Sequence, residues 1–323
     1  MDSWHLKAFL KIAETGSISR ASESLGVAQP SLSQQLLRLE EEVGVPLCRR
    51  TARGVTLTEA GRLFQQHARQ LLHWTDAAIE EVRQLSSEAS GAVVLAVPYS
   101  VSKVAGVALV RAFLAHAPQV QFRLVEAFTG QIRGWLEEGK VHLGIINDLG
   151  PMRNLLSRPI ASEELYLVGP AARFATSGGF ADVPASELSS LPMILPGPQH
   201  GLRQVIEHAL GRVGVSLTIR VEIDAMMHVP ALIAGGYGYS ILPLSAVSEA
   251  LAAKRVSLAR IAGGAIRRTL CLIRNGGNVV THASIRCEEL TMRVLMGLIA
   301  KHEWMAQPAA EFEEQHHEPG TAE

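Results

Sequence analysis

The sequence predicts three successive parts: an N-terminal all-α winged helix-turn-helix domain at residues 1–58, a long linker helix at residues 59–89, and a C-terminal α/β domain at residues 92–304. Three observations predict them. Short amphipathic helices separated by a tight turn fill the first part, an unbroken 3-4 spacing of apolar residues fills the second, and short apolar strands alternate with helices in the third. A chain of 323 residues, 47% of them hydrophobic, is long enough for two or three packed cores.

The composition excludes several classes of protein. No apolar stretch approaches the roughly 20 residues that a membrane-spanning helix needs. The charged residues among the first fifteen are unlike a secretory signal, so we expect a cytoplasmic protein without a membrane partner. Cys48, Cys271 and Cys287 are widely spaced and odd in number, so we expect reduced thiols, no disulfide framework and no metal site.

The first two helices are predicted from apolar stripes and from residues that start or end a helix. A stripe at i, i+3, i+4 and i+7 places a helix at residues 3–14: Leu6, Phe9, Leu10 and Ala13. Gly16 ends this helix, Ser17 is the expected N-cap of the second helix, and Gly26 ends the second helix in the left-handed conformation.

A third helix, residues 30–42, follows a turn at residues 27–29, with Pro30 expected at its first position. Its buried stripe is predicted to consist of Leu32, Leu36, Leu39 and Val43. The opposite face presents Pro30 together with hydroxyl, amide and guanidinium groups, which belong to Ser31, Gln34, Gln35 and Arg38, with Ser33 at its edge. Such groups can hydrogen-bond base edges and phosphates in a DNA major groove, although a surface helix facing water would also be polar.

Residues 48–58 alternate like a β-hairpin with a turn at Arg53-Gly54, which predicts a wing. Five arginines between residues 49 and 69 stand against one acid, Glu59, and form a small cationic patch. A patch of this size is also typical of an ordinary solvated surface. The order of the parts favours DNA binding, because the wing arginines could straddle the backbone or enter the minor groove.

A pattern that spans residues 9–61 connects these elements. It consists of Phe9, residues 13–36, Leu39-Glu40 and residues 44–47, 49–50, 53–55 and 57–61. The pattern resembles the DNA-binding domain of LysR-type transcriptional regulators. Cys48 and Ser22 depart from it, standing where the family usually has Phe and Ala, and we expect both to affect packing.

The resemblance implies that Gln29, Ser31, Ser33 and Gln34 approach bases and nearby phosphates, with Arg53 on the wing. The full set that we predict to contact double-stranded DNA comes from the helix-turn-helix and the wing: Ser17, Gln29, Pro30, Ser31, Ser33, Gln34, Arg38, Arg50 and Arg53.

The linker helix carries an apolar seam long enough for a two-stranded coiled coil. The seam residues that we predict to mediate dimerisation are Phe64, Ala68, Leu71, Thr75, Ala78, Val82 and Leu85. The seam could instead pack on the chain's own body. A dimer is favoured because a helix-turn-helix protein reads two half-sites. In the resembling family this helix is the dimerisation element, and the resemblance also implies a dimer of dimers.

The C-terminal part alternates strands and helices after a small-residue hinge at residues 86–91. The first series predicts strands at residues 93–97, 119–126 and 142–146, with helices at 103–116 and 130–138. The second predicts strands at 165–168, 193–195, 217–223 and 239–242, with helices at 202–213, 227–234 and 244–252. A strand at 269–274 and a helix at 281–300 follow, and crossover segments are expected near 147–164 and 262–268.

The LysR resemblance implies that this part is a two-lobed effector domain like a periplasmic binding protein. Lobe I is expected at about residues 92–161 and 268–304, and lobe II at about 162–267. Local similarities at residues 135–145 and 235–243 support the resemblance, although His142 replaces the usual Asp.

Ligands of open α/β sheets bind beyond the carboxyl ends of strands, where helices begin. The residues there that we predict to contact a small-molecule effector are Ser100, Ser102, Thr129, Gln199, His200, Met226 and His228. A Ser or Thr at the start of a helix is equally explained as a cap. A small organic acid is one candidate for the effector.

Residues 305–323 are polar and acidic, so we expect a disordered tail. No GxSxG, HExxH, Walker A or strand-following GxGxxG motif occurs, so we expect neither an enzyme nor a cofactor. Two alternatives stay open: a metabolite-binding module whose N-terminal helices mediate protein contacts, and an uncharacterised enzyme.

The sequence therefore predicts a LysR-type, ligand-responsive transcriptional regulator that reads a pseudo-palindromic site. The helix at residues 30–42 and the wing at residues 49–58 would read the DNA. The expected assembly is a homodimer or homotetramer, and RNA polymerase is a further candidate partner. Residues 49–55 and 128–130 resemble the nitrogen-assimilation-control subgroup.

Overall fold

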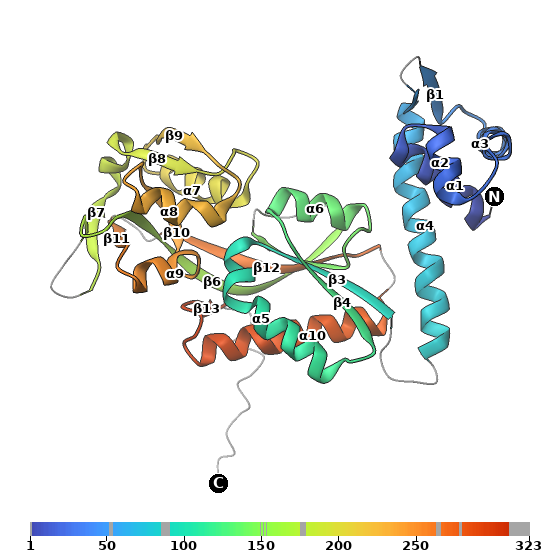
Figure 1. Cartoon of the computed structure of the whole chain (residues 1–323). Coiled ribbons are helices and arrows are strands. Elements are labelled where there is room, and N and C mark those ends of the chain that lie inside the picture. Colours follow the sequence, from blue (N-terminus) through green and yellow to red (C-terminus); the bar gives the residue numbers. More distant parts are fainter. Residues whose placement is uncertain are drawn as a thin grey trace, which may run out of the picture. The chain divides into compact units, whose positions relative to one another are not determined.

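The computed structural model describes residues 2–51, 54–84, 91–148, 150, 152, 154–174, 179–262, 266–277 and 280–309 (Figure 1). They form two compact units, one built mostly from residues 1–88 and the other from most of the remaining chain. The predicted fold class is confirmed: a helix-turn-helix with a β-hairpin wing, a long helix, and a two-lobed α/β domain. No helix among the described residues has the length and hydropathy needed to cross a membrane.

The N-terminal unit contains four helices and one hairpin among its described residues: α1 Ser3–Thr15, α2 Ile18–Leu25, α3 Gln29–Val43, β1 Cys48–Thr51, β2 Gly54–Leu57 and α4 Glu59–Gln84. The predicted helix ends are confirmed. Ser17 caps α2 by accepting a hydrogen bond from the Arg20 backbone N–H at 3.4 Å, and Gly16 and Gly26 end their helices at φ of 62° and 67°.

Leucines and aromatic residues from three helices form the core of this unit: Leu6, Phe9, Ile12, Leu32, Leu36 and Leu39 are buried. The prediction that Val43 joins this stripe was wrong, because its side chain is 36% exposed. Val43 is the last residue of α3, where Gly44 turns the chain at φ 83°. The hairpin is attached by a hydrogen bond from the Val55 N–H to the Gly16 carbonyl at 2.8 Å.

The start of α4 lies directly against the chain that enters the wing. Thr58 donates its backbone N–H to the Leu47 carbonyl at 3.0 Å, and its hydroxyl caps the N–H of Gly61 at 2.9 Å. A Cβ at Gly61 would overlap the same Leu47 carbonyl. Only glycine therefore allows this close approach of helix and chain.

Part of the predicted dimer seam makes contacts within its own unit. Phe64 makes an edge contact with Phe9 of α1, with ring centroids 5.2 Å apart, and Ala68 is fully buried in the same core. This end of the seam is therefore at least partly covered by its own unit, and its pairing with a second copy stays a prediction. Leu71 and Thr75 are exposed. Leu85 and the side chains of Ala78 and Val82 lie outside the described residues.

Lobe I of the C-terminal unit is a sheet covered on both faces. Its strands lie in the order β4-β3-β5-β12-β6. Figure 1 shows α5 and α10 on one face of the sheet and α6 on the other, and each face has its own buried core. The bounds are β3 Gly91–Val97, α5 Tyr99–His116, β4 Val120–Glu126, α6 Thr129–Glu137, β5 Leu143–Asn147, β6 Leu155–Pro170, β12 Arg267–Asn275 and α10 His282–Ala300.

Lobe II is built on the second half of β6, which pairs with β10 and β11, while β11 pairs with β7. A separate parallel pair, β8-β9, and three helices surround the core of this lobe. The bounds are β7 Ala181–Pro184, β8 Pro192–Leu195, α7 Gly201–Gly211, β9 Thr218–Glu222, α8 Val229–Ala234, β10 Ser240–Pro243, α9 Leu244–Ala252 and β11 Val256–Ala262, with 3-10 turns at Ala185–Ser190 and Met226–His228.

The first crossover between the lobes is a continuous strand. β6 pairs with β12 over Leu155–Glu164 in lobe I and with β10 and β11 over Leu165–Pro170 in lobe II. Most of the crossover segment predicted at residues 147–164 is therefore the first part of a strand. The strand predicted at residues 165–168 is only the second part of β6. Pro159 and the polar residues around it lack the apolar alternation that marks a strand.

The beginning of the predicted disordered tail is ordered. Gln307–Pro308 forms β13, which pairs with Ser162 and Ala161 of β6, and the N–H of Ala309 donates to the Ile160 carbonyl at 3.1 Å. The prediction of disorder was wrong for residues 305–309, because edge pairing supplies their backbone hydrogen bonds. Residues 310–323 lie outside the described residues. The strands β7 and β11 were also not predicted.

We expect Gly61→Ala to destabilise the N-terminal unit by about 2 kcal/mol, because the new methyl group must push α4 away from Leu47. Hydrogen exchange followed by mass spectrometry in peptides from residues 3–72 would measure the effect. Gln66→Ala, at an exposed position of the same helix, is the matched control and should change little. Equal protection in both variants would contradict the proposed close approach.

Candidate functional site

The DNA-facing surface predicted from the sequence is one exposed face of α3. Gln29, Pro30, Ser31, Gln34 and Arg38 are exposed, and Ser33 is half-buried at the edge of this face. α3 begins at Gln29, so Pro30 is its second residue and not its first. The N-cap Ala28 offers no side-chain hydrogen bond, and the first turn holds no acid. The free backbone N–H groups at this end therefore favour an anion such as a phosphate.

Arg20, near the turn between α1 and α2, is a cation that was not among the predicted DNA contacts. The exposed Arg20 donates from Nη2 to the Thr15 carbonyl at 2.7 Å, which fixes its guanidinium next to the predicted contact Ser17. Ser17 itself is half-buried and uses its hydroxyl oxygen as the cap of α2. Its hydroxyl proton can still be donated.

The wing is held to α3 by a carboxylate. Glu40 Oε1 accepts the backbone N–H groups of Leu47 at 2.7 Å and Cys48 at 2.9 Å. Burial, with Glu40 nearby, raises the pKa of the Cys48 thiol to about 11. Arg53 and the side chain of Arg50 lie outside the described residues.

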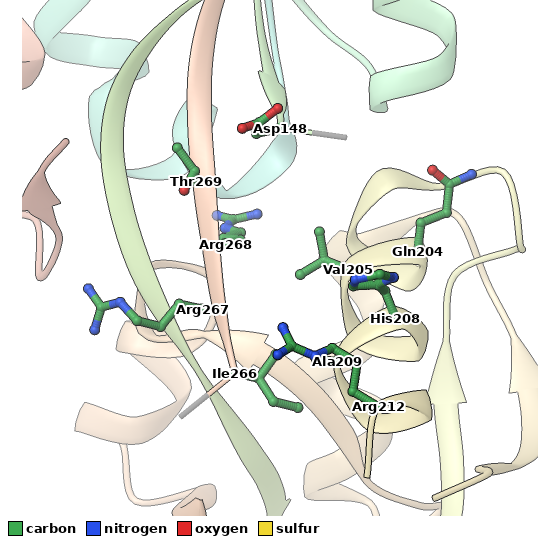
Figure 2. A pocket seen from close by; sticks show the side chains of 10 residues that line it. All are labelled: Asp148, Gln204, Val205, His208, Ala209, Arg212, Ile266, Arg267, Arg268 and Thr269. Atoms are coloured by element: carbon green, nitrogen blue, oxygen red, sulfur yellow. The ribbon is translucent and has the colours of Figure 1, made fainter. Parts of the chain in front are cut away.

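A buried ion pair occupies the place where the chain passes between the lobes. Arg268 of β12 and Glu163 of β6 are 3% and 2% exposed, and two guanidinium nitrogens donate to Glu163 Oε2, one of them, Nε, at 2.8 Å. Glu163 Oε1 accepts from the Ser245 hydroxyl at 2.9 Å and from the Trp304 indole N–H at 2.6 Å. The two buried charges therefore compensate each other, and the hydrogen-bond partners of Glu163 come from several elements. Figure 2 shows Arg268 on β12 among the side chains that line a cavity of about 670 Å³ between β12 and α7.

Two predicted effector contacts belong to this network. Arg268 Nη2 donates to the Ser100 hydroxyl at 2.6 Å, and Nη1 donates to Asn147 Oδ1 at 3.4 Å. The Asn147 amide in turn donates to the Thr129 hydroxyl at 3.3 Å. Ser100 and Thr129 are 5% and 4% exposed. Their hydroxyl groups therefore already have protein partners in this arrangement of the lobes.

The lobes touch at Gly201, the first residue of α7. A Cβ at this position would overlap the Thr129 side chain and would lie 3.0 Å from the Asn147 amide nitrogen. Glycine at Gly201 therefore allows the start of α7 to reach the residues that hold the ion pair.

A cavity of about 400 Å³, the His200 pocket, opens beside this contact. Its lining includes Tyr99, Phe128, His200, Met226, Glu126 and Asp224. The His200 ring stacks on Phe128 with centroids 5.7 Å apart, and its Nδ1 accepts the Leu202 N–H at 3.2 Å. Burial lowers the pKa of His200 to about 4, against the opposing effect of Asp224. His200 is therefore neutral at pH 7, with Nε2–H left as a donor.

The structure brings only part of the predicted effector set to this pocket. His200 and Met226 line it. Ser102 is half-buried on α5, and Gln199 and His228 are exposed, but none of these three is among the lining residues. The aromatic residues and the two acids that complete the pocket come from positions beside those predicted.

Neither a metal site nor a reactive thiol is found in the described part of the chain. No group of three His, Cys, Asp or Glu residues there could hold a metal ion. Cys271 and Cys287 are buried, and burial raises the pKa of Cys287 to about 12. A protonated thiol is a poor nucleophile.

We expect Glu163→Gln to destabilise the C-terminal unit by about 3 kcal/mol or more, because it leaves the Arg268 charge buried without a counter-ion. Urea unfolding followed by tryptophan fluorescence would measure it. The control is Glu249→Gln, which removes a pair with Lys103 at 3.5 Å whose carboxylate is 79% exposed, and it should cost less than about 1 kcal/mol. Equal losses in both variants would refute the assigned role of the buried pair.

Protein-family models match both units of the chain. The model described as bacterial regulatory helix-turn-helix protein, lysR family, matches residues 4–62, and the LysR substrate binding domain matches residues 86–286.

Similar proteins extend over most of the chain. The nitrogen assimilation regulatory protein nac of Klebsiella aerogenes is 30% identical over 84% of this chain and 88% of its own length. The HTH-type transcriptional regulator BbuR of Bordetella bronchiseptica is 29% identical over 84% of this chain and 83% of its own length.

Solved structures share the fold. A full-length OxyR variant from Pseudomonas aeruginosa has a TM-score of 0.71 at 22% identity, covering 91% of this chain and 94% of that one. Full-length CbnR complexed with its target DNA has a TM-score of 0.63 at 25% identity, covering 91% and 100%. With both family models matched in order along the sequence, the chain belongs to the LysR family of ligand-responsive, DNA-binding transcriptional regulators.

Proposed function

We propose that this regulator reads a pseudo-palindromic DNA site as a dimer, with the exposed face of α3 in the major groove. The observation that supports this most directly is the exposure of Gln29, Ser31 and Gln34 together at the start of α3. Amide groups can form two hydrogen bonds with adenine, while hydroxyl groups and free backbone N–H groups suit phosphates. The core side of the same helix is fully occupied by leucines, which leaves this face for DNA.

Cations around this face supply binding energy that does not depend on sequence. Arg38 on α3, Arg20 at the turn, and Arg50 and Arg53 on the wing are the groups that we assign to phosphates or to the minor groove. Neutralising phosphates releases counter-ions, so affinity should fall steeply as salt rises.

Dimerisation is assigned to the part of α4 that its own unit leaves uncovered. Leu71 is seven residues beyond Phe64 and so lies on the same side of the helix, but it is exposed where Phe64 packs on α1. Leu71 therefore offers an exposed apolar side chain, which we assign to a contact with the equivalent helix of a second copy. The family resemblance supports pairing of two such dimers into a tetramer.

The effector is assigned to the His200 pocket between the lobes. None of its described lining residues is Lys or Arg, while Glu126 and Asp224 contribute two carboxylates beside Tyr99 and Phe128. An uncharged or cationic small molecule suits this lining better than the organic acid considered from the sequence. Such a ligand would shift the lobe arrangement only as far as it binds one arrangement more tightly.

In this proposal the protein acts by binding alone, in the cytoplasm, and contacts RNA polymerase when it changes transcription. The alternative of a metabolite-binding module would show salt-sensitive DNA retention without sequence preference. Selection of bound sequences from a random DNA pool at two salt concentrations separates the two, because a regulator enriches a two-fold-symmetric motif.

We expect Gln29→Ala to relax the preference at one position of each half-site by about 1–3 kcal/mol while leaving the other positions unchanged. Fluorescence anisotropy with single-base variants of the selected site would measure this. Gln66→Ala removes an exposed amide from α4 and should leave the whole profile intact. If both variants keep the wild-type profile, the assigned reading face is wrong.

We expect Leu71→Asp to raise the dimer dissociation constant at least tenfold, because it places a charge in the proposed apolar contact. Sedimentation velocity of the full-length protein over a range of concentrations would show it. The same change at Gln66, Gln66→Asp, introduces the charge on a different side of α4 and should leave the dimer intact. An unchanged dimer in Leu71→Asp would exclude this part of α4 from the interface.

A further inference from the structure

Leu37 lies on the exposed face of α3, although its side chain is apolar. It is 53% exposed, whereas the preceding leucine, Leu36, is 6% exposed in the core. Leu37 follows Gln34 by three residues and Pro30 by seven, so these three exposed side chains lie along one side of the helix. The methyl groups of Leu37 are therefore available to whatever covers this face.

We propose that Leu37 is a specificity-determining residue that packs on the 5-methyl group of a thymine in the major groove. This rests on the proposed function, because the exposed face of α3 is taken as the DNA-reading surface. Of the four bases only thymine presents a methyl group in the major groove, and apolar side chains recognise it by contact. A phosphate would offer a leucine no favourable interaction.

The spacing of Gln34 and Leu37 suits two successive base pairs. Three residues advance an α-helix by about 4.5 Å, and successive bases of one strand are about 3.4 Å apart. Gln34 is exposed and carries an amide that can form two hydrogen bonds with adenine. When Gln34 lies against one base pair, Leu37 therefore reaches the next.

Charged residues on α3 limit where DNA can lie beside Leu37. The next residue, Arg38, is exposed and can hold a phosphate. Glu41, one turn further along the side that carries Leu37, is also exposed, and its carboxylate repels phosphates. Leu37 is thus the last side chain on this side of α3 before an acid. This position places it at the end of the contact with the bases.

The thymine methyl group can be removed without changing the hydrogen bonds of its base pair. Uracil is thymine without the 5-methyl group, so the exchange of one thymine for deoxyuridine isolates the apolar contact. Burial of one methyl group changes an equilibrium constant by a factor of about four. An effect of this size can be measured on each duplex separately.

The experiment uses the full-length protein and the two-fold-symmetric site selected from the random DNA pool. Each thymine of either strand is replaced in turn by deoxyuridine, and fluorescence anisotropy measures the affinity for every duplex. We expect replacement at one position of each half-site to weaken wild-type binding about fourfold. In Leu37→Ala the same replacement should have no effect, whereas Leu37→Met keeps an apolar side chain and should stay sensitive. Leu63→Ala, which truncates a 58% exposed leucine of α4, is the matched control and should keep the wild-type ratio.

Three results would overturn the proposal. They are equal affinity of the wild-type protein for all duplexes, an unchanged fourfold loss in Leu37→Ala, and disappearance of the loss in Leu63→Ala. Each can occur with a protein that still selects a two-fold-symmetric site, so the proposed function would stand without this contact. A random pool that yields no motif would contradict the proposed function itself, and this contact with it.

Discussion

The buried pair of Arg268 and Glu163 is the interaction on which the C-terminal unit depends. Two charges out of water are tolerated only where every donor and acceptor is satisfied. Here Ser100, Asn147, Ser245 and Trp304 supply the remaining hydrogen bonds. These four residues come from α5, β5, α9 and the segment after α10. The ion pair therefore connects elements of both lobes to β6 and β12, the strands on which Glu163 and Arg268 lie. A ligand beside this network acts on the same few side chains that hold the lobes.

The N-terminal unit is held by backbone contacts of a different kind. Glu40 fastens the wing to α3, and Gly61 lets α4 approach the chain at Leu47. The core side of α3 is anchored by Leu32, Leu36 and Leu39, so its polar face is presented on a rigid support. This rigidity matters because hydrogen bonds to base edges tolerate little displacement.

Local signals were enough to predict the helix-turn-helix but not the site between the lobes. Capping residues and glycines act within a few positions of one another, so the ends of α1 and α2 could be read from Ser17, Gly16 and Gly26. The burial of Ser100 and the pairing of β13 depend on contacts across more than a hundred residues. A stripe of apolar residues on α4 likewise indicates a buried face but does not say whether α1 or a second chain covers it, and only the structure shows that Phe64 contacts Phe9 of α1.

The segment after α10 determines how truncations and fusions near this part of the chain affect lobe I. Trp304 is buried against the carboxylate of Glu163, and Gln307–Pro308 extends the sheet as an edge strand. A stop codon or frameshift upstream of Trp304 would remove an indole donor and a strand from lobe I at once, leaving Glu163 short of one partner. Affinity tags and fusion partners are accordingly best joined at the N-terminus or well downstream of Ala309, where they do not replace a structural strand.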